Sequence, residues 1–144
     1  MNRETIYAAL FTKLSSMSGI VTKSRILVHW DEVSTRDQPA LYQTQISETP
    51  IQTKGMPTKW NLKAQIHLYA NRGGDHKAIP SQTINTMIDN IESILKPDSN
   101  GFQTLGGLVS HCWISGTILT SEGLLGDQEV AIVPIDILVT NQLF

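Results

Sequence analysis

The sequence predicts an α+β fold with two helices packed on one face of a mostly antiparallel sheet of about five strands. Three observations carry this prediction: a long alternating stretch at Pro57–Ala70, an isoleucine-rich helical stripe over residues 79–95, and turn-rich segments between the remaining apolar runs. Hairpin-length connections favour antiparallel neighbours. The predicted order is α-β-β-β-α-β-β, in a single domain over residues 1–144.

The stretch Pro57–Ala70 is the strongest strand pattern in the chain. From Trp60 onward apolar and polar residues alternate without a break, which gives a strand one buried and one solvated face. About five or six residues is usual for a strand, so this one should lie at the sheet centre or extend from the body. The segment before it, Thr49–Thr58, contains two prolines and a glycine. We therefore expect a hairpin with a protruding arm around residues 47–60.

Helical spacing of apolar residues predicts the two helices. The first covers Arg3–Ser16, with Asn2 as its N-cap and Gly19 at its end. The second begins around Pro80, a residue suited to the first helical turn. The apolar stripes that we expect to face the core are Ile6, Leu10, Leu14 and Met17 in the first helix, and Ile84, Met87, Ile88, Ile91, Ile94 and Leu95 in the second.

Four further apolar runs read as strands: Arg25–Trp30, Pro39–Glu48, Leu108–Leu119 and Glu129–Thr140. Within the last run, Pro134 has no N–H to donate to a sheet ladder. We therefore expect this strand to lie at an edge or to carry a bulge at that residue.

Composition excludes several classes of function. Lysine and arginine number 11 against 13 acidic residues, a net charge of −2, so no basic stripe for nucleic acid is present. The lone cysteine, Cys112, cannot form an intrachain disulfide and reads as a buried apolar residue. Neither a signal peptide nor a run near the ~20 residues of a membrane span occurs. We expect no membrane association and a cytoplasm-like compartment.

No motif in the chain predicts catalysis. The four histidines lack metal-ligand spacing, and neither an HExxH nor a CxxC pattern occurs. Asp31 and Glu32 are adjacent carboxylates, which favours a solvated strand end or a subunit contact over acid–base work. We expect the three tryptophans to be core or interface anchors. The chain is therefore expected to be no enzyme and to have no catalytic, cofactor or metal residues.

Several segments together resemble phage tail terminator or tail-completion proteins, the small neck and tail proteins of long-tailed phages and prophages. These segments are RETIYAALFTKL, RILVHWDEV…DQPALY, KWNLKAQIHLYA with the following loop and helix, GFQTLGGLVSHCWISG, and GDQEVAIVPIDILV. The resemblance lies in the order and character of the segments over nearly the whole chain. It implies an α/β domain that forms a hexameric ring at the head-proximal end of the tail tube.

The implied ring would stop tube polymerisation and present a surface for head attachment. Its implied partners are copies of itself, the tail tube protein and the head–tail connector protein, with DNA only as cargo passing through. The chain would be part of the virion tail, assembled in the host bacterial cytoplasm. By analogy, subunit contacts would come from three loops: Ile51, Gln52, Lys54, Gly55, Met56 and Pro57; Arg72, Asp75, His76 and Lys77; Glu122, Leu124, Leu125 and Asp127.

Two other interpretations remain open from the sequence. The chain could be another phage structural protein, either a tail tube subunit or a head–tail joining protein. It could also be a small ligand-binding module that uses the polar sheet face, although no cluster of histidines or carboxylates marks such a site.

Overall fold

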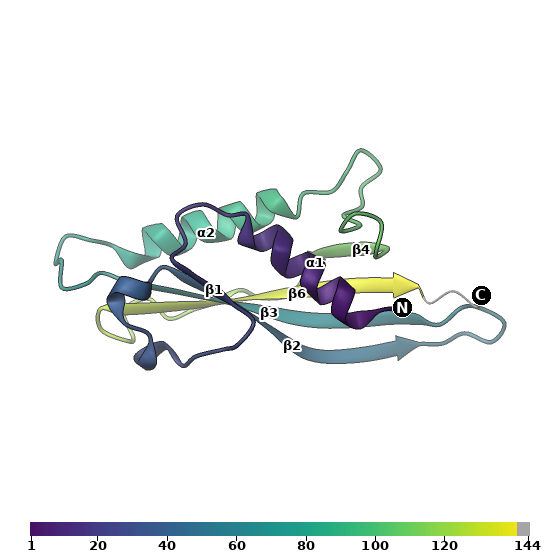
Figure 1. The fold of residues 1–144 in the computed structure, drawn as a ribbon, viewed down its shortest axis with the longest axis horizontal. Coiled ribbons are helices and arrows are strands. Elements are labelled where there is room, and N and C mark those ends of the chain that lie inside the picture. The colour runs from purple at the N-terminus through teal and green to yellow at the C-terminus, as the bar shows by residue number, and fades with distance from the viewer. Residues whose placement is uncertain (141–144) are drawn as a thin grey trace.

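A computed structural model describes residues 1–140 as a sheet covered on one face by two helices (Figure 1). Two short 3₁₀ turns, at Trp30–Glu32 and Thr35–Asp37, interrupt the connection before the second strand. The elements in chain order are α1 (Arg3–Ser15), β1 (Thr22–Ser24), β2 (Ala40–Ile51), β3 (Lys59–Asn71), α2 (Pro80–Ile94), β4 (His111–Ile114), β5 (Leu119–Thr120) and β6 (Gln128–Thr140).

Over residues 1–140 the sheet is mixed, with six strands in the order β1-β2-β3-β6-β4 and with β5 also beside β6. Only the pair β1 and β2 is parallel among the described strands. The 13-residue strand β3 lies between β2 and β6, and pairs with β6 from Lys59 to Asn71. The α+β class, the central position of the long strand and its alternation are thus confirmed, whereas the sheet is not wholly antiparallel.

Both helices lie on the same side of the sheet, as predicted (Figure 1). The Asn2 side chain accepts a hydrogen bond from the Thr5 amide at 3.0 Å and so caps α1. Between the helices and the sheet lies one large apolar core, in which each large buried side chain stabilises the fold by about 1.5–3 kcal/mol. Its fully buried members include Leu10, Leu14, Leu62, Ile66, Leu68, Ile84, Ile91, Ile135 and Ile137.

The predicted strand Arg25–Trp30 is wrong. The strand here is Thr22–Ser24, and the following residues cross the opposite face of the sheet. Val28 and Trp30 pack there against Tyr42 and Tyr69, and the Tyr69 hydroxyl donates to the Val28 carbonyl at 2.7 Å. Val28 and Trp30 are partly buried because they pack on the sheet, and they do not pair with its strands.

The predicted strand Leu108–Leu119 is divided into β4 and β5, and β6 is not an edge strand. Gly116, at φ 95°, lies between the two short strands and faces Pro134 of β6. The Pro134 carbonyl accepts from the Ser115 amide at 3.0 Å, but its nitrogen has no hydrogen to donate on that side. Pro134 is therefore accommodated where its neighbouring strand is broken, and no register shift occurs in β6 opposite β3.

Candidate functional site

The three predicted contact segments lie at the two opposite ends of the elongated sheet. Residues 52–58 form the hairpin tip between β2 and β3, at the right in Figure 1. Residues 72–78, which lead into α2, and residues 121–127, which lead into β6, lie together at the left end. We call the first group, together with the preceding Ile51, the hairpin tip, and the second group, together with Ile79 that follows residue 78, the loop end.

The hairpin tip is exposed and extends beyond the paired strands. Its one internal backbone bond joins the Met56 amide to the Thr53 carbonyl at 3.0 Å, and Gly55 takes the positive φ of 81° that this turn requires. Lys54 is exposed and has no hydrogen-bond or ion-pair partner among residues 1–140. Two large apolar side chains are also exposed here, Ile51 at 49% and Met56 at 55%.

The base of the hairpin is held to α1. Arg3 pairs with Glu48 at 2.5 Å and lies over the ring of Trp60, 4.8 Å from its centroid. The buried Tyr7 hydroxyl donates to Glu48 at 3.0 Å, and burial and this carboxylate raise the pKa of Tyr7. These contacts anchor β2 and β3 to α1 near the base of the hairpin, and the tip extends beyond them.

The structure brings the two predicted loops of the loop end into direct contact. Arg72 pairs with Asp127 at 2.7 Å, and the Arg72 amide donates to the Asp127 carbonyl at 3.1 Å. Asp75 accepts from the Lys77 amide at 3.0 Å, while His76 and Lys77 are exposed. The sequence predicts these residues in two separate loops. The register of β3 with β6 brings the loops together, and local sequence does not reveal it.

A buried network of side-chain amides lies next to the loop end, where β3 ends and β6 begins. Gln38 and Gln128, 7% and 5% exposed, hydrogen-bond to each other twice, at 2.8 and 2.9 Å. Asn71 also donates to Gln128, at 3.1 Å. Because these amides satisfy one another, the network links the crossing segment before β2 to the ends of β3 and β6.

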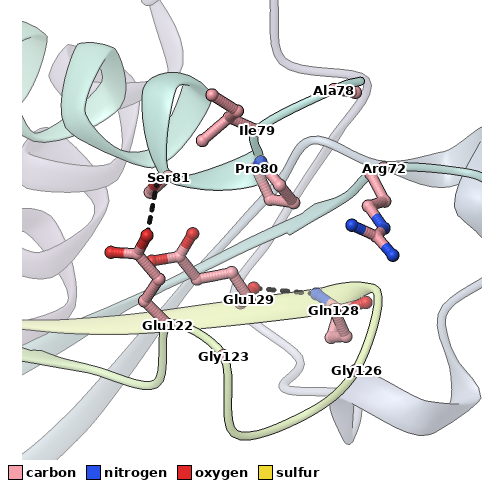
Figure 2. Close-up of a pocket in the computed structure, with 10 residues that line it drawn as sticks. All are labelled: Arg72, Ala78, Ile79, Pro80, Ser81, Glu122, Gly123, Gly126, Gln128 and Glu129. Atoms are coloured by element: carbon pink, nitrogen blue, oxygen red, sulfur yellow. Dashed lines mark hydrogen bonds between the residues drawn. The ribbon is translucent and has the colours of Figure 1, made fainter. Parts of the chain in front are cut away.

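A pocket of about 210 Å³ opens at the loop end, between the first turn of α2 and the start of β6 (Figure 2). Both Glu129 and Glu122 line it, and the Glu122 carboxylate accepts from the Ser81 hydroxyl at 3.3 Å. The remaining lining residues are Arg72, Ala78, Ile79, Pro80, Gly123, Gly126 and Gln128.

Glu129 is the residue of this site that sequence reasoning missed. It is 3% exposed, and burial together with the nearby Glu122 carboxylate raises its pKa above the ordinary value. The sequence did hold a signal for its burial. Glu129 is in phase with Ala131 and Val133, which face the core, so its side chain belongs on the same face.

The sheet face opposite the helices carries the apolar cluster around Tyr42 and Tyr69 together with polar and charged side chains of β3 and β6. Asp136 is buried on this face and pairs with Lys63 at 3.0 Å. Burial lowers the pKa of His67, whose Nε2 lies 3.4 Å from the Thr44 hydroxyl. Asp136 and His67 thus each have a polar partner within this face.

Residues 1–140 contain neither a metal-binding cluster nor a membrane-spanning helix. No group of three or more histidine, cysteine, aspartate or glutamate residues is arranged to hold a metal ion in this part of the chain. Within the same residues, neither helix has the length and apolar character needed to cross a bilayer.

The fold is similar to that of a known protein, although no sequence match is found. No family model and no curated protein sequence matches this chain. Among solved structures, it is similar to a chain in the virion of a native gene transfer agent (GTA) particle, with a TM-score of 0.57. The identity is 10%, and the similarity covers 94% of this chain and 95% of that chain. The two chains therefore share one fold over nearly their whole lengths.

Proposed function

We propose that this chain is a structural protein of a phage-like virion, and that it forms a ring, of six copies, at the head-proximal end of a tail tube. The ring would stop tube polymerisation and present the surface for head attachment. The role is one of contact with neighbouring proteins and requires no catalytic residue.

The observation that carries the proposal is the shared fold with a chain of the GTA virion, over 94% of this chain. The surface agrees with such a role, since large apolar side chains are exposed at both ends of the sheet. They include Ile51 and Met56 at the hairpin tip, and Ile79 and Leu124, 50% and 78% exposed, at the loop end. Exposed apolar groups rimmed by polar residues are typical of protein–protein contacts.

The tail tube protein, the head–tail connector protein and further copies of the chain are the proposed partners, with DNA passing through the ring as cargo. The proposed place of action is the virion tail, after assembly in the host bacterial cytoplasm.

Electron microscopy of particles made without this protein tests the assignment. Loss of a terminator should give tail tubes of uncontrolled length. Finished tails lying free beside full heads would instead indicate a head–tail joining protein, and particles without tubes would indicate a tube subunit. Particles of normal form and infectivity would contradict a structural role in the virion.

A further inference from the structure

Glu129 is 3% exposed and lines the pocket, and its carboxylate has no partner among residues 1–140. No hydrogen bond or ion pair joins its carboxylate to another side chain among residues 1–140; the bond drawn from Gln128 in Figure 2 ends on the Glu129 backbone carbonyl. The nearest ionisable group that affects it is Glu122, which carries the same charge. Removal from water disfavours the charged form of this carboxylate, so a cation supplied by another molecule would stabilise it here.

The pocket in front of Glu129 suits a lysine side chain. Its volume of about 210 Å³ is on the scale of one side chain, and Ala78, Ile79 and Pro80 give its wall apolar surface. Arg72 also lines the pocket, but its guanidinium is already paired with Asp127. A lysine would lay its methylene stem along the apolar wall and place its ammonium beside the two glutamates.

Lys54 is an exposed lysine whose side chain is available for such a contact. It is exposed in the hairpin tip and unpaired among the described residues. The tip and the pocket lie at opposite ends of the sheet (Figure 1), so Lys54 cannot reach the pocket of its own chain.

Apolar groups beside the two charges match as well. Ile51 and Met56 are exposed close to Lys54, whereas Ile79 forms part of the pocket wall and Leu124 is exposed on the adjoining loop. A tip seated over the pocket would bury apolar surface on both sides around a central charge contact. Buried apolar anchors around a desolvated centre are characteristic of strong protein contacts.

We infer that the hairpin tip of one copy docks on the loop end of the next, with the Lys54 ammonium between the Glu122 and Glu129 carboxylates. This inference rests on the proposed function, and names the contact by which copies would join. Because the two surfaces differ, the contact repeats head to tail and generates either a closed ring or an open filament.

Charge-neutral variants test this contact in the full-length chain. Lys54→Gln and Glu129→Gln should each raise the dissociation constant between copies by about tenfold or more, as expected for a close charge pair. The double variant should be little worse than either single one, since both remove the same interaction. Lys96→Gln, at an exposed lysine after α2, is the matched control and should leave assembly unchanged.

Carbodiimide cross-linking of the unmodified protein gives an independent test. It should yield an amide bond between Lys54 and Glu122 or Glu129, found by mass spectrometry only in covalent multimers. A wild-type multimer that neither variant weakens and that lacks this cross-link would overturn the docking contact while leaving the proposed function intact. A wild-type chain that stays monomeric at all concentrations, alone and with tail tubes, would overturn both.

Discussion

Replacing the two apolar residues of the hairpin tip should separate assembly from folding. In the variant Ile51→Asp with Met56→Asp, each altered side chain was already about half exposed, at 49% and 55%. Surface substitutions of this kind usually change the free energy of unfolding by less than about 0.5 kcal/mol each. We therefore expect a cooperative unfolding transition and a circular dichroism spectrum close to those of the wild type.

The effect on association follows from the same exposed fractions. Full burial of such a side chain is worth about 1.5–3 kcal/mol, so burying the remaining half of each in a contact is worth about 1 kcal/mol. Losing both contributions, about 2 kcal/mol, corresponds to a roughly 30-fold weaker contact. Burying an introduced aspartate adds a further penalty, so the 30-fold figure is a lower bound.

Light scattering over a concentration series, read alongside circular dichroism, is the appropriate assay. Ile26→Asp is a matched control, because Ile26 is 78% exposed but lies in the segment after β1, outside both the hairpin tip and the loop end. An unchanged multimer in the doubly substituted chain would refute the role of the hairpin tip. If Ile26→Asp weakened association between copies to the same extent, the effect would not be specific to the hairpin tip.

Three further predictions concern the folded chain itself. Ile66→Ala, at a side chain with no exposed surface, should lower the free energy of unfolding by about 2–5 kcal/mol in a urea titration, whereas a change below 1 kcal/mol would contradict its place in the core. Burial raises the pKa of Cys112 to about 12, so a thiol reagent at pH 8 should label it only in denaturant. Because the pKa of Glu129 is raised in the folded state, its ionisation opposes folding above its unfolded value near 4.5 and has no effect well below it. Glu129→Gln should therefore raise the free energy of unfolding of the isolated chain at pH 7 but not at pH 3. A substitution that leaves the free energy of unfolding unchanged at both pH values would argue against an unpaired charge.

The sequence predicted well where one physical requirement dominated each residue. The alternation in β3 and the stripe in α2 report burial on one face, and the structure places Leu62, Ile66, Ile84 and Ile91 in the core between them. These two patterns, together with the stripe of Ile6, Leu10 and Leu14 in α1, predicted the α+β class and both helices, because periodicity and burial are directly linked.

Prediction from the sequence failed where apolar residues are buried without sheet hydrogen bonds, and where strand pairing depends on distant segments. Val28 and Trp30 are packed against the sheet without joining it, so their apolar character was misread as a strand. Pro134 is compatible with an internal strand because its neighbour is interrupted beside Gly116, a pairing that local sequence cannot reveal. The pocket likewise depends on the register that brings β6 beside β3, which joins segments more than 40 residues apart in the chain.

The Glu129 carboxylate affects both the stability of the chain and its proposed assembly. A neutral glutamine there should make the isolated chain more stable and the multimer weaker. A residue retained for packing alone would not produce these opposite effects, because its replacement would lower both.

Native mass spectrometry of the purified chain over a range of concentrations tests the central claim most directly. A virion ring protein of the proposed kind should appear as a discrete multimer, with six copies as the expected number, and its population should rise with concentration. A single-chain mass at every concentration, unchanged when tail tubes are added, would contradict the claim that this protein works by binding copies of itself.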